Sequence, residues 1–393
     1  MNIREAHFKQ LLDKKLKQSR YKQLKCIIPF EEINSDDPSK PILNFSSGDF
    51  LGLSNHPFVK KNTIKYVLKW GAGSSASRLM TSHLERQHEL EKKLASSLNK
   101  EATFFLNPVQ NIHELTLTPL GAKDTIFFID DSVSNLIKKA AKLSSAQVIY
   151  FPHNNITKLT SLIEAHCVPT KAKVIVSESI FHTVGDFAPL PELCKLASHS
   201  ASLLYIDDSL SFSSHGFSGF GLAAPRMGVD IAISGFGRSC GAFGNFVATS
   251  ETLKEYLIQF CPELSSVTLL PPAALGAIDA AIGLIPDMHE ERNKMKTFSL
   301  ILKEALGEKE LNIGDPKAHI FPIQFSCDQE LLHCYSHLVE EQILVQNIKN
   351  SGLSSKPLLR FIISASHSKE QINALISRFK SWSPPLQYEK AFN

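Results

Sequence analysis

The sequence predicts an α/β fold: a large domain around a mostly parallel, seven-stranded sheet, followed by a smaller C-terminal α+β domain. Short apolar runs recur between residues 102 and 250, and most are apolar throughout rather than alternating. Such runs are typical of strands that helices cover on both faces. Stretches with the 3.6-residue helical period separate them, which indicates a doubly wound layer. The predicted strands are 102–107, 125–130, 147–152, 173–178, 202–207, 230–235 and 245–250.

Helices are predicted before and after this layer. The segment 85–100 places leucines at four-residue intervals, and 271–285 begins with two prolines and continues in helix-forming residues. Beyond it, apolar strands such as 319–326 and 358–364 mix with helical stretches. A chain of 393 residues is long enough for two domains. We therefore expect an N-terminal helical arm at 1–45, a large α/β domain at 46–285 and a small α+β domain at 286–393.

Charge and composition exclude several classes of partner. The net charge is only +3, with 42 basic and 39 acidic residues, so nothing calls for a nucleic acid or a membrane surface. The most basic stretch, 9–25, carries Leu11, Leu12, Leu16 and Leu24 at helical spacing. It predicts a solvated amphipathic helix, and a nucleic-acid-binding arm is the alternative reading.

The cysteines and the N-terminus point to the cytoplasm. The first 25 residues lack an apolar signal segment, and no run reaches the roughly 18 apolar residues of a membrane-spanning helix. The seven cysteines are scattered, odd in number and without a C-x-x-C pair, which argues against a disulfide framework and a zinc site. Nor do His83, His88 and His113 have the spacing of metal ligands.

Ligands of open α/β sheets bind beyond the carboxyl ends of the strands, and this rule selects the first candidates. The strand at 125–130 ends in Asp130 and Asp131, and the strand at 202–207 ends in Asp207 and Asp208. The strand at 230–235 runs into the turn "SGFGRSCGAFG", which holds four glycines around Arg238. Glycines permit a tight turn and a close approach to a ligand. For each carboxylate, a helix cap or a solvated strand end is the alternative.

Six segments, in order and spacing, resemble the α-oxoamine synthases. This fold-type-I group of pyridoxal 5'-phosphate (PLP) enzymes includes 8-amino-7-oxononanoate synthase, the most similar in length and spacing, and serine palmitoyltransferase. The resemblance implies a homodimer and a decarboxylating condensation of an amino acid with an acyl-CoA, with PLP held on a lysine as a Schiff base. The segments are "NFSSGDFLGLSNHP" (44–57), "GAGSSASRLMTSHLERQHELEKKLA" (71–95), "SIFHTVGDFAPLPEL" (179–193), "IDDS" (206–209), "SGFGRSCGAFGNF" (234–246) and "LLPPAALGA" (269–277).

The resemblance assigns roles to three residues. Asp207 falls on the aspartate that pairs with the pyridinium nitrogen of PLP, and Arg360 falls on the arginine that binds the amino-acid carboxylate. Thr268 falls near the position that reaches the phosphate from the neighbouring subunit.

At four places the sequence departs from the family pattern. Arg238 stands at the lysine position, and arginine stays protonated with delocalised nitrogens, so it cannot form the Schiff base. Ser134 replaces the histidine that stacks on the cofactor ring, and Leu210 replaces a second histidine. In the phosphate-binding loop, here 107–112, Pro108 has no N–H to donate. Because all four positions face one cofactor, we expect that covalent PLP catalysis has been lost.

Other residues near the expected site have two readings each. His182 lies where the family has a small polar residue near the ring oxygen of PLP; it is either a new acid–base group or a satisfied buried histidine. We interpret Cys240 as a buried, inert thiol rather than a nucleophile.

Three functions remain open. The chain is expected to be a non-catalytic protein that either supports a lysine-bearing homologue as its partner subunit or binds acyl-CoA or another anion in the old cleft. The alternative is an active acyl-CoA:amino-acid acyltransferase in which Lys138 or Lys139 supplies the amine. The third is reversible binding of PLP without covalent capture.

Overall fold

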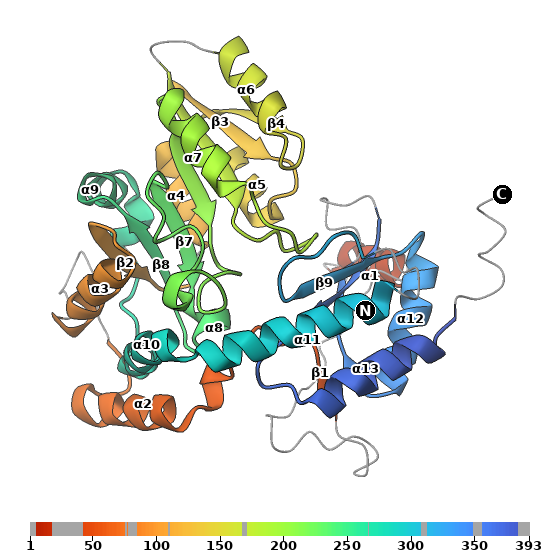
Figure 1. Ribbon diagram of the computed structural model, residues 1–393. Coiled ribbons are helices and arrows are strands. Elements are labelled where there is room, and N and C mark those ends of the chain that lie inside the picture. Colours follow the sequence, from red (N-terminus) through yellow and green to blue (C-terminus); the bar gives the residue numbers. More distant parts are fainter. Residues whose placement is uncertain are drawn as a thin grey trace.

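A seven-stranded, mostly parallel sheet forms the centre of the molecule, as predicted (Figure 1). The computed structural model describes residues 5–17, 42–74, 77, 85–108, 111–166, 171–265, 267–307, 313–348 and 356–383. The strand order is β2-β8-β7-β6-β5-β3-β4, and β8 is antiparallel to both of its neighbours. The bounds are β2 Ala102–Leu106, β3 Thr125–Asp130, β4 Gln147–Phe151, β5 Ala172–Glu178, β6 Leu203–Asp207, β7 Ile231–Gly235 and β8 Asn245–Thr249.

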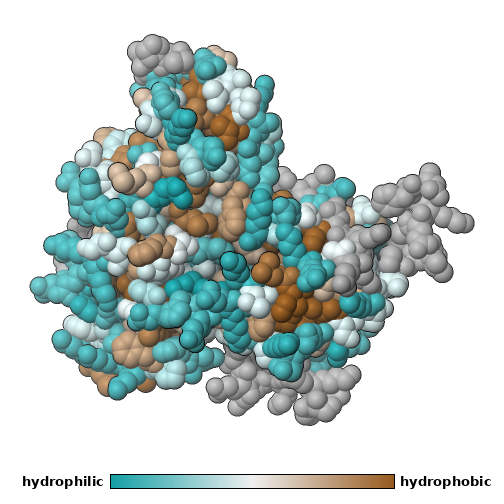
Figure 2. Space-filling view, viewed as in Figure 1, coloured by the Kyte–Doolittle hydropathy of each residue, from teal (hydrophilic) through white to brown (hydrophobic). Residues whose placement is uncertain are grey.

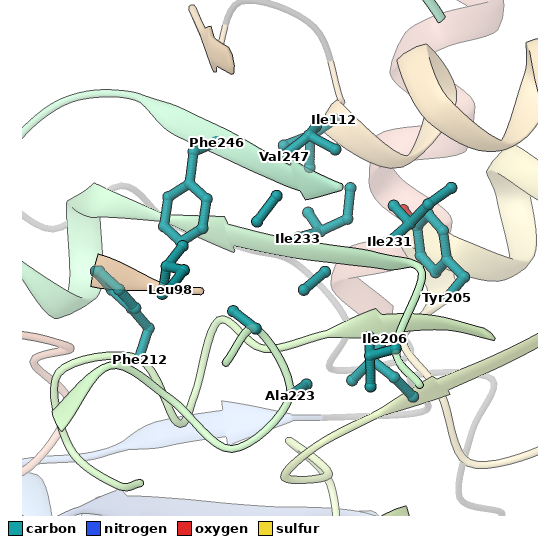
Figure 3. Close-up of a cluster of buried hydrophobic side chains, with 14 of the residues drawn as sticks. Leu98, Ile112, Tyr205, Ile206, Phe212, Ala223, Ile231, Ile233, Phe246 and Val247 are labelled. Atoms are coloured by element: carbon teal, nitrogen blue, oxygen red, sulfur yellow. The ribbon is translucent and has the colours of Figure 1, made fainter. Parts of the chain in front are cut away.

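Burial explains why the strand runs are apolar throughout. All residues of β2 and β3 are buried, and so is most of β5 to β8. In Figure 3, Tyr205, Ile233, Phe246 and Phe212 lie in one cluster around these strands. The prediction of burial on both faces is wrong for β4, an edge strand that leaves Tyr150 37% exposed. The other edge strand, β2, is buried throughout, so the exposure of β4 reflects less complete cover by the rest of the chain and not its edge position alone.

Helices surround the sheet, and two of them pack unusually closely. The helices are α1 Ala6–Lys17, α2 Pro57–Trp70, α3 Glu85–Ser97, α4 Ile112–Leu120, α5 Asn135–Leu143, α6 Ile156–Ala165, α7 Leu190–His199, α8 Phe236–Ser239, α9 Glu251–Phe260, α10 Pro272–Leu284, α11 His289–Gly307, α12 Asp328–Glu340 and α13 Lys369–Ser381. The predicted helices 85–100 and 271–285 are α3 and α10. Helix α2 approaches α10 so closely that a Cβ added to Gly276 would lie 2.8 Å from the carbonyl oxygen of Asn62.

A second hydrophobic core lies around a smaller sheet. Strands β11 (Gln346–Ile348), β12 (Leu358–Ile362) and β9 (Ile320–Gln324) form an antiparallel sheet, and β1 (Leu43–Asn44) pairs with β10 (Ile343–Leu344). Figure 1 shows the long helix α11 reaching from the side of α10 to this group. The face shown in Figure 2 is mainly hydrophilic, with smaller hydrophobic areas between.

The N-terminal segment is described only in part. Helix α1 forms in the predicted basic segment, and Leu11, Leu12 and Leu16 on its apolar stripe are each about half exposed. Leu24 lies outside the described residues. Within the part of the chain that the structure describes, no helix has the length and apolar character needed to cross a membrane.

Candidate functional site

A cavity of about 680 Å³ opens beyond the carboxyl ends of β5, β6 and β7, where the sheet rule places a ligand. It collects residues from both sheets, because Arg360 comes from β12 of the smaller one. We refer to it as the cleft. The sequence-predicted residues that line it are Pro108, Ser134, His182, Asp207, Leu210, Arg238 and Arg360.

Asp207, the last residue of β6, is held in its charged form. Its Oδ2 lies 3.2 Å from Nε2 of His113, and its Oδ1 accepts the Ser209 backbone N–H at 2.9 Å. Burial disfavours the charged carboxylate, but the hydrogen bonds and the charge of His113 outweigh it and lower the pKa of Asp207 to about 2. The other nitrogen of His113, Nδ1, lies 2.8 Å from the hydroxyl of buried Tyr205. Asp207 therefore presents a permanent negative charge to the cleft.

A buried carboxylate at the end of β5, the register partner of Asp207, organises the adjoining part of the wall. Oε2 of Glu178 lies 3.1 Å from Nδ1 of His182 and accepts the backbone N–H of the same residue at 3.2 Å. Its Oε1 accepts the backbone N–H of Ser134 at 2.6 Å. Ser134 itself caps α5, since its hydroxyl accepts the N–H of Ile137. His182 is neither fully buried nor fully exposed, and Glu178 fixes its ring at the cleft wall.

The imidazole of His153 lies between two carboxylates and holds the loop that carries His182 in place. Nδ1 of His153 lies 3.1 Å from Oδ1 of Asp130, and its Nε2 lies 3.0 Å from Oδ2 of Asp186. Burial disfavours the charged imidazole, but hydrogen bonds to both carboxylates raise the pKa of His153 to about 10. This contact ties the loop after β5 to the ends of β3 and β4.

Arg360 is 7% exposed and contacts only neutral acceptors. Its Nε donates to Oε1 of Gln346 at 2.8 Å, its Nη2 donates to the same oxygen, and its Nη1 donates to the backbone carbonyl of His182 at 2.9 Å. Burial, and then the positive charge of Arg238, lower the pKa of Arg360 to about 10, while Glu178 opposes this shift. The guanidinium is therefore held rigidly at the cleft without a carboxylate partner.

Arg238 lies on the one-turn helix α8, which forms where the sequence predicted only a glycine turn. Its neighbour Phe236 is fully buried, and the ring centroids of Phe236 and Phe246 are 5.1 Å apart. The hydroxyl of Ser239 donates to the carbonyl of Gly235 at 2.7 Å. These contacts fix the backbone, while the Arg238 side chain is exposed and lines the cleft.

Several candidates lie away from the cleft. Thr268 accepts a hydrogen bond from Asn107 at 3.0 Å and does not line the cleft, so its expected role toward a neighbouring subunit stays a prediction. The other strand-end carboxylates serve local structure: Asp208 is fully buried and accepts the N–H groups of Ala223 and Ala224. Asp130 binds His153, and Asp131 is exposed.

The remaining basic and thiol candidates are also engaged or buried elsewhere. Nζ of Lys138 donates to the carbonyl of Asp131, and Nζ of Lys139 lies 3.1 Å from Oε1 of Glu114. Cys240 is fully buried. His88 is partly exposed on α3, and His83 lies outside the described residues. Among the residues whose placement is described, no three potential ligands gather around a metal position.

Three residues of the site were missed by sequence reasoning. His113 contacts Asp207, 94 positions away. Glu178 contacts His182, 4 positions away, and Gln346 accepts a hydrogen bond from Arg360, 14 positions away. Glu178 was recognisable, since it ends a predicted strand as the aspartates do. His113 and Gln346 carry no such signal.

Comparisons with known proteins agree with this architecture. The family model for aminotransferase class I and II matches residues 40–379. A putative 8-amino-7-oxononanoate synthase from Paramagnetospirillum magneticum is 32% identical over 351 residues, covering 86% of this chain and 88% of that protein. An 8-amino-7-oxononanoate synthase from Alkaliphilus oremlandii is 28% identical over 390 residues, covering 96% and 97%.

Solved structures share the fold. A serine palmitoyltransferase variant from S. paucimobilis, with a bound PLP–myriocin aldimine, superposes with a TM-score of 0.86 at 19% identity, covering 96% of this chain and 97% of that one. An 8-amino-7-oxononanoate synthase from Francisella tularensis gives 0.75 at 23% identity, covering 91% and 100%. The expected fold-type-I architecture is thereby confirmed, and the chain belongs to the aminotransferase class I and II family.

Proposed function

We propose that this chain is a relative of the α-oxoamine synthases that binds a small anionic ligand in the cleft without a covalent link to lysine. One observation carries the proposal: Arg238 lines the cleft on the turn where the family places its lysine, and no described residue lining the cleft is a lysine. A guanidinium keeps its proton and has no free lone pair, so it cannot condense with an aldehyde.

The cleft suits the pyridine nitrogen of PLP, but among its described residues it offers no lysine for covalent attachment of the cofactor. Asp207 is charged and has lone pairs beyond the two that His113 and Ser209 use, so it suits a protonated pyridine nitrogen. PLP, when bound, supplies an electron sink for carbanion chemistry. Leu210 and Ser134 offer no ring for stacking, and Pro108 offers no N–H to a phosphate. These residues support reversible binding at most.

The residues of the cleft are suited to binding and orienting an anion. Arg360 is fixed by Gln346 and keeps two N–H groups beyond the three that it donates. Arg238 adds a second cation, and His182 presents an imidazole oriented by Glu178. Guanidinium groups bind carboxylates and phosphates through paired hydrogen bonds.

A dimeric assembly in the cytoplasm, with a second copy or with a lysine-bearing homologue, is part of the proposal. An apolar surface hollow of about 650 Å³, lined by α2, the loop after α8 and the first turns of α10, supports the dimer. Its lining includes Ile64 and Phe243, which are 59% and 49% exposed. Exposed apolar surface of this kind favours a protein interface. In a mixed dimer, this chain would support a catalytic partner, and that homologue would be recovered with it on purification.

The second candidate is an active acyl-CoA:amino-acid acyltransferase. Relatives named as 8-amino-7-oxononanoate synthases, which match 86% and 96% of the chain, favour it. It requires an amine in the cleft, and both Lys138 and Lys139 are engaged by other groups. This candidate predicts release of coenzyme A from an acyl-CoA with alanine, glycine or serine.

Borohydride trapping separates the two candidates. The purified protein is titrated with PLP, reduced with borohydride and digested, and its peptides are mapped by mass. At one equivalent of PLP, we expect no single lysine of the natural chain to be modified stoichiometrically, and we expect stoichiometric modification of residue 238 in Arg238→Lys, which restores the amine on an unchanged turn. A single lysine trapped stoichiometrically in the natural chain would refute the proposal, and release of coenzyme A would also establish the acyltransferase.

A further inference from the structure

Two arginines face one cleft, and neither has a carboxylate partner. Arg238 reaches it from the turn after β7, and Arg360 reaches it from β12. Among the residues that the structure describes, no hydrogen-bond or ion-pair partner contacts the guanidinium of Arg238. Arg360 donates only to a side-chain amide and a backbone carbonyl. Both arginines line the same cavity, and the positive charge of Arg238 contributes to the lowered pKa of Arg360.

The position of Arg238 is defined by a close contact with the backbone at Gly48. A Cβ added to Gly48 would lie 2.8 Å from Cγ, 3.1 Å from Cβ and 3.3 Å from Cδ of Arg238. Because glycine has no side chain, the aliphatic part of Arg238 can pack against Gly48. No ion pair joins the adjacent Asp49 to Arg238 among the described residues; its carboxylate is turned to the N–H groups of Leu53 and Ser54 instead.

The two carboxylates that line the cleft are already partnered. Asp207 contacts His113 and Glu178 contacts His182, as described above. These contacts orient both carboxylates, and Asp207 keeps its negative charge. Among the described residues, neither carboxylate forms an ion pair with a guanidinium of the cleft, so both arginines keep N–H groups for an anionic ligand.

We propose that the ligand of this cleft carries two negative charges, as a short dicarboxylate does, with one carboxylate on Arg360 and the other on Arg238. The inference rests on the proposed function. If residue 238 formed a Schiff base, it would lose its positive charge and Arg360 would be the single cation of the pair. Planar guanidinium groups bind carboxylates through two parallel hydrogen bonds, so both ends of such a ligand are recognised by geometry as well as by charge.

Calorimetry on the natural chain tests the two-charge requirement without any variant. Succinate and succinamate have nearly the same size, and succinamate replaces one carboxylate by a neutral amide. We expect succinate, or malonate or glutarate if the spacing differs, to bind about 10-fold or more tightly than its monoamide, because a charge-assisted hydrogen-bond pair is lost. Raising the salt concentration weakens the preference.

Variants assign the second carboxylate to Arg238. In Arg238→Gln, we expect the dicarboxylate to lose about 10-fold in affinity while the monoamide changes less than about twofold. Arg238→Lys retains the charge and is expected to lose less. Lys158→Gln removes one positive charge from the exposed side of α6, away from the cleft, and is the matched control with unchanged affinity.

The outcomes separate this inference from the proposed function. Equal affinity for the dicarboxylate and its monoamide, no binding of any dicarboxylate from malonate to glutarate, or an equal loss in Lys158→Gln would each overturn the inference. Binding of inorganic phosphate alone, lost in Arg238→Gln, would also overturn it and identify a phosphate site. If borohydride traps a single lysine of the natural chain stoichiometrically, the proposed function fails instead.

Discussion

Replacing Asp207 by asparagine tests whether the carboxylate at the end of β6 is held charged by its surroundings. In the folded protein its pKa falls from the ordinary value of 3.8 to about 2. Its side chain is 14% exposed, so solvent screens the effect little. The difference corresponds to about 2 kcal/mol of the free energy of unfolding at neutral pH. We therefore expect Asp207→Asn to unfold about 2 kcal/mol more easily at pH 7.

The pH dependence gives a second, sharper test of the same carboxylate. Because the folded-state pKa is below the unfolded-state value, the contribution is fully present above about pH 5. It is lost as the pH falls through 3.8 toward 2, with about half gone at pH 3. Urea unfolding of both proteins at pH 7, 5 and 3.5 measures the gap, and common acid effects cancel between them.

A matched control removes the general effect of losing a carboxylate. Asp131 directly follows β3, which is separated from β6 by β5, and is exposed, so Asp131→Asn is expected to stay within about 0.5 kcal/mol of the natural protein. A gap below 0.5 kcal/mol for Asp207→Asn at pH 7, or a gap that does not narrow with acid, would refute the account of the His113–Asp207 contact.

Three further predictions concern packing, reactivity and alkaline pH. Gly276→Ala is expected to lower the free energy of unfolding in urea by about 1–3 kcal/mol, because the new Cβ would meet the backbone of α2. Gly283→Ala lies in the same helix, meets open space and is expected to stabilise the protein by up to about 1 kcal/mol. Equal effects of the two substitutions would contradict the close packing. Burial raises the pKa of the Cys240 thiol to about 12, so iodoacetamide at pH 8 should modify it only after unfolding, as peptide mass mapping will show. His153→Gln is expected to lose about 3 kcal/mol of the free energy of unfolding at pH 6. Because the folded-state pKa of His153 is raised to about 10, the stabilisation is full below about pH 6.5 and disappears as the pH rises through 10. A loss that does not change with pH would disprove the charged contact.

Sequence patterns located the sheet and most of the cleft because both depend on local signals. Buried parallel strands are apolar throughout, and their carboxyl ends mark the site, so Asp207 and Arg238 were found without any coordinates. The family resemblance added Arg360, which lies on a different sheet. The edge position of β4 was not predictable, since its sequence is as apolar as that of the inner strands.

The contacts that give the site residues their properties were beyond the reach of a single sequence. His113 meets Asp207 only because α4 and β6 are brought together by the fold, and 94 positions separate the two residues. Gln346 reaches Arg360 through the pairing of β11 with β12. Such contacts depend on tertiary geometry, which residue spacing does not encode.

The turn at α8 makes residue 238 open to evolutionary change. Its backbone is held by the buried ring of Phe236, by the hydroxyl of Ser239 and by the hydrogen bond from the N–H of Phe236 to the carbonyl of Gly244. None of these contacts uses the side chain of Arg238. Mutation can therefore alter the chemistry of the site while the scaffold stays intact, and a saturation library at this codon would sample new ligands on a stable protein.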